Sequence, residues 1–218
     1  MKLLLTSSGF TNKTIVNAFR ELLGKPFSET ELVFIPTAAN VESGDKGWLI
    51  DDMNNAKKLG LKSIDVVDIS ALPKEIWESR IEKADVIMVS GGNSYHLVYW
   101  MNKSGFIDVL NEWLKTKVYV GISAGSMVMS KDLSLATAQK IYHEDLNQID
   151  IEKGLGFVDF ITRPHLNSEW FPSAREDVLK QQAKKIPGPI YAIDDNSAIQ
   201  VVDGEIELIS EGKWLKFN

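Results

Sequence analysis

Short β-branched runs alternate with longer helical patterns over the first 120 or so residues, and this rhythm limits the fold more than any other feature. Strands are predicted at Lys2–Thr6, Glu31–Pro36, Leu61–Ile69, Asp85–Ser90 and Lys117–Gly121. Helices are predicted at Asn12–Leu23, Trp48–Leu59, Pro73–Lys83 and Tyr95–Leu114, the last with a break near Ser104-Gly105. Because parallel neighbours need long crossovers, and helical crossovers bury the sheet, the chain predicts a doubly wound α/β fold: a mainly parallel sheet with helices on both faces.

The alternation of strand and helix patterns ends after about Ser130. A further strand is predicted at Gly156–Thr162 and a helix at Ser173–Lys185, followed by short strands at Ile190–Ile193, Ala198–Val202, Ile206–Ile209 and Lys213–Phe217. Asp203-Gly204 favours a tight turn because both residues tolerate positive φ, so the C-terminal part is expected to contain β-hairpin elements. No repeat or linker divides the sequence, and we expect one domain over residues 1–218.

Composition excludes several classes of function. The chain has 24 Lys+Arg against 30 Asp+Glu, a net charge of −6, which is a poor match to the phosphate backbone of nucleic acids. With no cysteine it has no thiolate nucleophile, disulfide or cysteine-bearing metal site. The apolar run at Leu3–Leu5 is too short for a signal peptide, and no stretch is long enough to span a membrane. We therefore expect a cytoplasmic protein without membrane or nucleic-acid partners.

The strongest chemical signal is Gly121-Ile122-Ser123-Ala124-Gly125, directly after an apolar strand. A Gly-x-Ser-x-Gly sequence at a strand end allows a tight strand-to-helix turn in which Ser123 projects above the sheet. The alternative is that the two glycines make an ordinary tight connection and Ser123 caps a helix. The strand–turn–helix context favours a nucleophilic serine.

A nucleophilic serine needs a base, and the chain has three histidines. His165 follows a predicted strand in Arg163-Pro164-His165, where a proline-stiffened loop would hold the imidazole at the carboxyl edge of the sheet. We take it as the general base. His96 starts an apolar helix, which favours a packing or surface role, and His143 lies in a polar stretch.

A carboxylate should orient that base. The best candidate is the turn Asp194-Asp195-Asn196, although two adjacent acids at a strand end are often only turn formers. Glu144, Asp145 and Asp159 compete with this turn for the role because they precede His165.

A second glycine-rich turn, Ser90-Gly91-Gly92-Asn93-Ser94, follows a predicted strand and opens a helix. Gly91 and Gly92 let backbone N–H groups approach a ligand, and with the amide of Ala124 these groups would form an oxyanion hole. A phosphate cradle is the rival interpretation, but neither Gly-Lys-Ser/Thr nor Gly-x-Gly-x-x-Gly spacing is present.

Four ordered motifs together resemble the serine peptidase family S51, which includes dipeptidase E and cyanophycinase. They are Gly91-Gly92-Asn93, Gly121–Gly125, Arg163-Pro164-His165 and Ile193–Ile199. The resemblance covers most of the chain and implies an α/β fold similar to class I glutamine amidotransferases, with serine in place of their cysteine. It implies Ser123 as nucleophile, His165 as general base and Asp195 as the acidic member, with the amides of Gly91, Gly92 and Ala124 stabilising the oxyanion.

The sequence departs from the family at the acidic position. The family usually has Glu where Asp195 stands, and the shorter side chain must be compensated by a shift of backbone or imidazole. Some dipeptidase E sequences place an Asp shortly after the nucleophile, but Leu135–Gln139 offers no carboxylate. Arg175 resembles an arginine that follows the catalytic histidine in dipeptidase E. Asn93 and Arg175 are therefore candidate substrate-binding residues, with a solvated helix-start arginine as the alternative for Arg175.

These residues predict hydrolysis through a Ser-His-Asp acyl-enzyme that needs no metal or organic cofactor. The family resemblance implies short peptides, including N-terminal aspartyl dipeptides, as the substrates. Alternatives are a cyanophycinase-like hydrolase of β-aspartyl peptides, an α/β-hydrolase esterase, whose usual order is Ser, acid, His, and a non-catalytic small-molecule binding protein on the same scaffold. Nothing in the sequence distinguishes a monomer from a homodimer.

Overall fold

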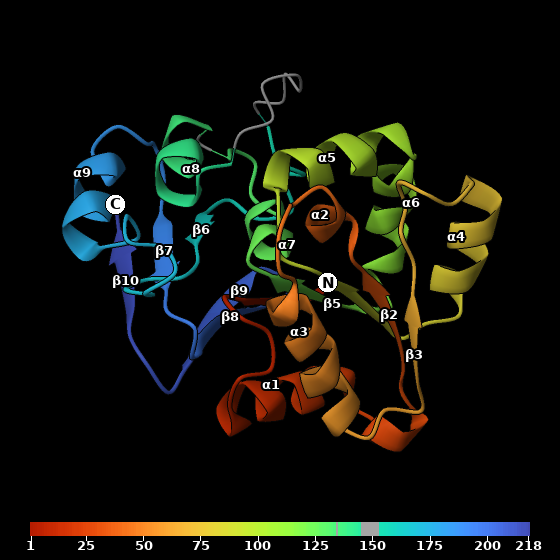
Figure 1. Cartoon of the computed structure of the whole chain (residues 1–218). Helices are drawn as coiled ribbons and strands as arrows, with labels where there is room; N and C mark the ends of the chain where they lie inside the picture. The colour runs from red at the N-terminus through yellow and green to blue at the C-terminus, as the bar shows by residue number, and fades with distance from the viewer. Residues whose placement is uncertain (134, 145–152) are drawn as a thin grey trace.

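A mainly parallel sheet forms the centre of the protein, as a computed structural model describes it for residues 1–133, 135–144 and 153–218. Its strand order is β3-β2-β4-β5-β1-β8-β9 (Figure 1). Five strands are parallel: β1 (Lys2–Thr6), β2 (Glu31–Ile35), β3 (Ser63–Val66), β4 (Val86–Val89) and β5 (Val118–Ile122). The hairpin of β8 (Ser197–Val202) and β9 (Glu205–Ser210) extends the sheet antiparallel to β1.

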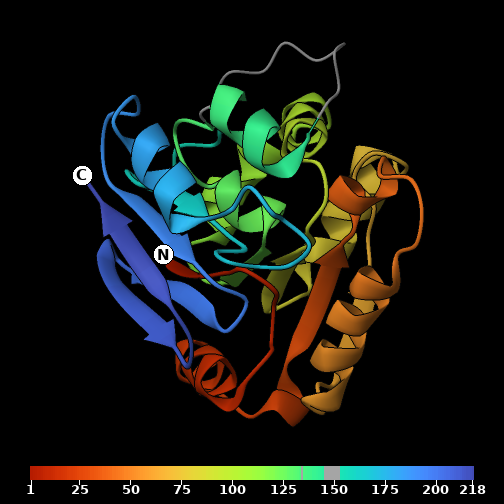
Figure 2. The same cartoon turned by 60° about the vertical axis from the view of Figure 1, so that its left-hand side comes forward.

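Helices cover both faces of this sheet (Figures 1 and 2). One face carries α1 (Lys13–Leu23) and α3 (Gly47–Lys58), and the other carries α4 (Lys74–Glu82), α5 (Ser94–Lys103) and α6 (Phe106–Trp113). Strand β1 shows why both faces are apolar: Leu3 and Leu5 belong to the core on the α4–α6 side, and Leu4 belongs to the core on the α1–α3 side. The predicted doubly wound α/β fold is confirmed.

A smaller sheet lies beside the first, with the order β10-β7-β6 (Figure 1, left). It consists of β6 (Ile161–Arg163), β7 (Ile190–Ile193) and β10 (Trp214–Phe217), and α9 (Glu176–Ala183) packs against it. Short elements complete the described chain: the 3-10 helix Phe27–Glu29, α2 (Thr37–Asn40), α7 (Ala124–Met127) and α8 (Leu135–Tyr142).

Two local predictions are confirmed by backbone geometry. The long helical pattern breaks into α5 and α6 at Gly105, whose φ of 77° no helix accepts. The β8–β9 hairpin turns at Asp203 and Gly204, with φ of 49° and 93°.

Other boundaries were wrong. No strand spans 156–162: residues 154–158 follow residues 128–131 through irregular backbone hydrogen bonds, and β6 begins only at Ile161. The predicted strand Leu61–Ile69 is limited to β3, because after Val66 the chain bends so that the Thr37 hydroxyl binds Asp68 and the amide of Ile69. Helices α2 and α8 were not predicted, and α9 begins at Glu176 rather than Ser173.

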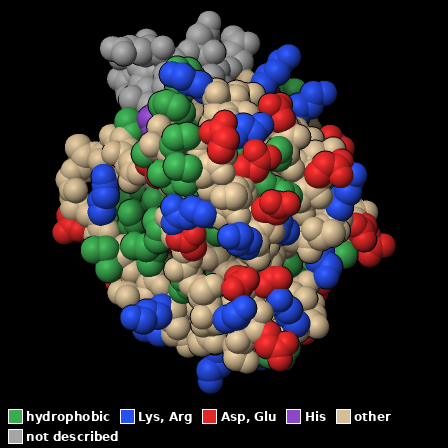
Figure 3. All heavy atoms as spheres, turned by 90° about the vertical axis from the view of Figure 1, so that its right-hand side faces the viewer, with side chains coloured by type: hydrophobic (Ala, Val, Ile, Leu, Met, Phe, Trp, Pro, Cys, Tyr) green, Lys and Arg blue, Asp and Glu red, His purple; other side chains and the backbone are tan. Residues whose placement is uncertain are grey.

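Figure 3 shows the side of the molecule on which β3 and α4 lie, and its surface agrees with the expectation that the protein has no basic stripe for nucleic acid. Basic and acidic side chains are interspersed there with scattered hydrophobic ones, so this side presents no stripe of a single sign. Among the described helices, none is both long and apolar enough to cross a membrane.

Asp52, on α3, gives the fold a pH dependence that can be measured. Its side chain is buried, and burial, with the neighbouring Asp51 charge, raises its pKa from 3.8 to about 7. Because its pKa is raised on folding, protonated Asp52 stabilises the protein fully below pH 3.8, and this stabilisation is lost as the pH rises through about 7. Asparagine has no such loss. The free energy of unfolding of Asp52→Asn, measured with urea, should therefore increase by about 2–3 kcal/mol relative to that of wild type as the pH rises from about 5 to about 8. Parallel pH curves for the two proteins would contradict this.

Candidate active site

The turn that carries Ser123 connects β5 to α7. Ser123 has φ 46° and ψ −106°, a strained conformation that is typical of a serine held on a strand-to-helix turn. Neither glycine of the motif has room for a side chain. A Cβ on Gly121 would lie 2.6 Å from the carbonyl oxygen of Gly125, and one on Gly125 would overlap the carbonyl oxygen of Val89. The Gly-x-Ser-x-Gly sequence thus lets the turn pack against β4 while Ser123 stays partly exposed.

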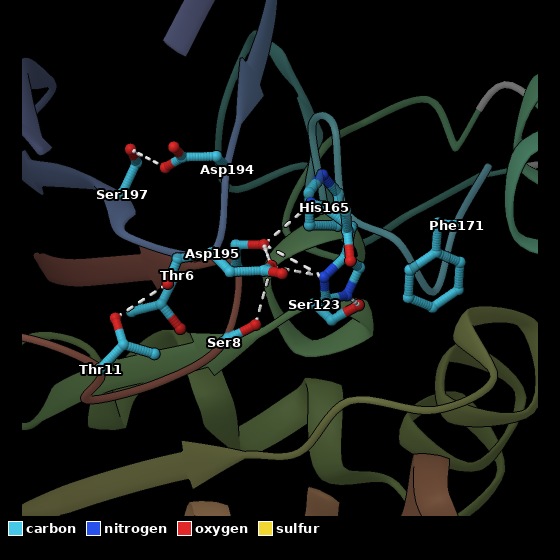
Figure 4. Close-up of polar contacts among 12 residues, drawn as sticks. Thr6, Ser8, Thr11, Ser123, His165, Phe171, Asp194, Asp195 and Ser197 are labelled. Carbon is cyan, nitrogen blue, oxygen red and sulfur yellow. Dashed lines mark hydrogen bonds and ion pairs between the residues drawn. The ribbon is translucent and has the colours of Figure 1, made fainter. Parts of the chain in front are cut away.

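Ser123, His165 and Asp195 form one continuous hydrogen-bonded chain (Figure 4). The distance from Ser123 Oγ to His165 Nε2 is 2.9 Å, and that from His165 Nδ1 to Asp195 Oδ1 is 2.7 Å. The ionised carboxylate only accepts hydrogen bonds, so the proton lies on Nδ1 and leaves Nε2 free to accept from the serine. The three residues follow the ends of β5, β6 and β7, in keeping with the strand-end positions that the sequence pattern predicts.

Two serines after β1 hold the carboxylate, and sequence reasoning missed them. The hydroxyls of Ser7 and Ser8 donate to Asp195 Oδ1 at 2.7 and 2.8 Å, and Ser7 Oγ also accepts from the backbone N–H of His165 at 2.8 Å. Ser7 therefore ties the base and the acid to β1. The only available signal was a Ser-Ser pair at a strand end, which ordinarily indicates a turn.

Electrostatics keep Asp195 ionised. Burial would raise the pKa of this carboxyl, but the hydrogen bond and charge of His165 and the hydroxyls of Ser7 and Ser8 hold it well below its usual value. Asp194, next to it, turns the other way: it accepts from Ser197 Oγ at 2.6 Å and from the backbone of Asn196 and Lys213. The two adjacent acids thus have separate roles, one at the base and one in the turn.

The imidazole is fixed by its own loop. His165 has φ 63°, and its ring stacks on Phe171 with 4.4 Å between centroids and 20° between planes. Tyr142 donates to the carbonyl of Pro164 at 3.0 Å. Arg175 Nη1 donates to the carbonyls of Ser168 and Phe171 at 2.9 and 3.2 Å, so this arginine braces the loop that carries Phe171.

The second glycine-rich turn, Ser90–Ser94, lies against Ser123. A Cβ on Gly91 would be 3.3 Å from Ser123 Cβ, and Gly92, with φ 124°, leaves no room for one against the backbone of Ala38 and Ala39. In the described parts of the chain, the amides of Gly91, Gly92 and Ala124 donate to no protein acceptor. Asn93 caps α5, since its Oδ1 accepts from the amide of His96 at 3.0 Å.

The other candidates lie elsewhere. His96 is half-buried with its ring near Trp100, and burial lowers its pKa, while His143 and Asp159 are exposed. Glu144 is buried and bound to Ser94 rather than to His165. Asp145 lies outside the described residues.

Comparisons with known proteins find peptidases of similar sequence and fold. The chain is 27% identical to an uncharacterized peptidase of Pasteurella multocida, over 96% of this chain and 97% of that one. It is 24% identical to a peptidase E of a Nostoc species, over 59% and 54% of the two chains. A crystal structure of a candidate peptidase E protein from Listeria monocytogenes covers 97% of this chain and 98% of its own, with a TM-score of 0.80 and 26% identity.

The match to a family model is equally extensive. The model of peptidase family S51 covers residues 3–209, a span that includes Ser123, His165 and Asp195. The expected fold family and the expected class of enzyme are therefore confirmed: this chain belongs to peptidase family S51 and is a serine-type peptidase.

Proposed function

We propose that this protein hydrolyses short peptides through an acyl-enzyme formed on Ser123. The observation that carries the proposal is the unbroken chain from Ser123 Oγ through His165 to Asp195, with both hydrogen bonds shorter than 3 Å. A serine hydroxyl is a weak nucleophile on its own, and an adjacent neutral imidazole oriented by a carboxylate is the arrangement that activates it. A binding protein would have no need of this alignment.

The positions of these atoms support the following sequence of steps. His165 Nε2 takes the Ser123 proton as Oγ attacks the peptide carbonyl, and then gives it to the leaving amine. Asp195 stabilises the imidazolium that forms between the two transfers. The amides of Gly91, Gly92 and Ala124 donate to the oxyanion of the tetrahedral intermediate. Water, deprotonated by His165, then releases the acyl group.

N-terminal aspartyl dipeptides are the proposed substrates. Relatives of this chain are named peptidase E, and an acidic side chain next to the scissile bond needs a cationic partner. Arg175 supplies one on the loop beside His165: its Nη1 is engaged with two loop carbonyls, which fixes the guanidinium and leaves its other edge for a carboxylate. Asn93 is the second proposed contact, through the amide nitrogen that its helix-capping oxygen leaves free.

A dipeptide library tests the proposal. It should contain Asp-X, Asn-X and β-aspartyl-X pairs, assayed with wild type, Ser123→Ala and Arg175→Gln. We expect Asp-X to be hydrolysed well above Asn-X by wild type, with no turnover by Ser123→Ala. Arg175→Gln also removes the contacts that brace the histidine loop, which affects both substrates, so kcat/KM should fall by about 10–100-fold more for Asp-X than for Asn-X. A preference for β-aspartyl pairs would instead support the cyanophycinase-like alternative, and hydrolysis by Ser123→Ala would reject the mechanism.

A further inference from the structure

Glu144 follows α8 directly, and its carboxylate reaches the N-terminus of α5. The side chain is only 6% exposed, Oε1 accepts from Ser94 Oγ at 2.8 Å, and Oε2 accepts from the backbone N–H of Ser94 at 3.2 Å. Ser94 is itself fully buried and opens α5, so its amide has no partner within the helix. Glu144 therefore satisfies the buried amide of Ser94 and gives the Ser94 hydroxyl a stronger acceptor than its other partner, Met127 Sδ at 3.9 Å.

A carboxyl group in this place is costly, which argues for a specific role. Burial raises the pKa of Glu144 to about 7, against the opposing effect of the Ser94 hydrogen bonds. The buried guanidinium of Arg163, from β6, lies close enough to act on Glu144 electrostatically; its Nη2 donates to the carbonyl of Leu133, while Nε and Nη1 find no hydrogen-bond acceptor in the described chain. Helix capping alone does not require a buried carboxyl group within electrostatic range of a buried guanidinium. Glu144 contacts the turn of Gly91 and Gly92, and Arg163 precedes the loop of His165.

Ser94 belongs to the same turn as the proposed oxyanion donors. On one side that turn is held by α2, because the backbone N–H of Asn93 donates to the carbonyl of Ala38 at 2.9 Å and Gly92 packs against the same peptide. On the other side, the contacts of Ser94 with Glu144 hold it. The direction in which the amides of Gly91 and Gly92 point depends on both supports.

The segment that carries Glu144 also contacts the base. Tyr142, in the last turn of α8, donates to the carbonyl of Pro164, and its ring lies 6.4 Å from that of His165, edge-on. We propose that Glu144 is a positioning residue that fixes the Gly91-Gly92 amides relative to Ser123, so that the end of α8 aligns the oxyanion hole with the base. This rests on the proposed function, and Glu144 itself contacts neither Ser123 nor His165.

Glu144→Ala, Glu144→Gln and the control Glu112→Gln test the proposal. Glu112 is an exposed glutamate paired with Lys115 on α6. Glu144→Ala should lower kcat by about 10–100-fold with KM within about threefold, because the amides that Glu144 positions bind the oxyanion of the transition state and not the ground-state substrate. It should slow the labelling of Ser123 by an alkyl fluorophosphonate by a similar factor, since the P=O oxygen uses the same amides. Glu144→Gln should restore both to within about fivefold of wild type, because its amide can accept from Ser94 N–H and donate to Ser94 Oγ.

Wild-type kcat and labelling rate in a folded Glu144→Ala protein would overturn the proposal, as would equal losses in the Ala and Gln variants. If Glu144→Ala does not fold, Ser94→Ala takes its place: it removes the 2.8 Å hydrogen bond and should lower both rates by about 3–10-fold, and unchanged rates would equally overturn the proposal. An inactive Ser123→Ala with a fully active Glu144→Ala would leave the proposed function standing and reject only this inference.

Discussion

Asp195→Asn is expected to lower kcat by about 1,000–10,000-fold, with KM changed by less than about threefold. The asparagine amide fits the same space, but it can present its NH₂ group to His165 Nδ1 and so stabilise the tautomer whose Nε2 carries the proton. That tautomer cannot accept the Ser123 proton. The imidazolium also loses the negative charge that now lies 2.7 Å from Nδ1. Steady-state kinetics on an Asp-X dipeptide measure the effect.

Asp194→Asn is the matched control, one residue away. Asp194 accepts hydrogen bonds from Ser197, Asn196 and Lys213 and contacts neither Ser123 nor His165 through any described hydrogen bond. Its loss should destabilise the turn by about 1–3 kcal/mol while kcat stays within about fivefold of wild type. If the two variants lose activity equally, or if Asp194→Asn loses more, the assignment of Asp195 as the acidic member is wrong.

Gly92→Ala is the second substitution with a large expected effect. Its φ of 124° is unfavourable for any L side chain, and the new Cβ would overlap the backbone of Ala38 and come within 2.6 Å of the amide nitrogen of Ala39. Neither neighbour is a flexible side chain, so the turn must move away from α2. We expect a loss of about 3–5 kcal/mol in the free energy of unfolding and a decrease in kcat of more than about 100-fold in the molecules that remain folded.

Gly188→Ala separates the effect of a positive φ from the effect of the steric overlap. Gly188 also has a positive φ, 89°, but nothing lies within 4 Å of its Cβ position, so only the backbone penalty of about 1–2 kcal/mol applies. Urea unfolding and kcat are measured for both variants. A Gly92→Ala protein as stable and active as Gly188→Ala would mean that the amides of this turn do not have to be held where the structure has them.

The sequence predicted those parts of the site that depend on local residue types at strand ends. The turn at Ser123 needs Gly121 because a Cβ there would meet the backbone of Gly125, and it needs Gly125 because a Cβ there would meet Val89 of β4. The Gly-x-Ser-x-Gly sequence states both requirements directly. Gly91 and Ser123 follow the predicted strands that are β4 and β5, and His165 follows β6, which overlaps the strand predicted there only at Ile161 and Thr162. Carboxyl ends of strands in an α/β fold gather at one side of the molecule. That shared position is why these three residues could be grouped from the sequence alone.

Contacts between distant segments were beyond the same reasoning. Asp194 and Asp195 are identical in type and adjacent, and only the positions of Ser7, Ser8 and His165 distinguish them. The Ser7 contacts also bring the imidazole within reach of a side chain as short as aspartate, because the hydrogen bond from the backbone N–H of His165 to Ser7 Oγ holds the histidine loop against β1, close to Asp195. The strand error at 156–162 has a similar cause, since residues 154–158 are shaped by hydrogen bonds to residues 128–131 rather than by their own β propensity.

The most direct test of the central claim, that Ser123 is a nucleophile activated by His165, is covalent labelling followed by intact-mass and peptide mapping. An alkyl fluorophosphonate reacts with activated serines whatever the natural substrate is. Wild type should gain one label, mapped to Ser123, Ser123→Ala should gain none, and His165→Ala should be labelled about 1,000-fold more slowly while remaining folded. Labelling that persists in Ser123→Ala, or an equal rate in His165→Ala, would contradict the account.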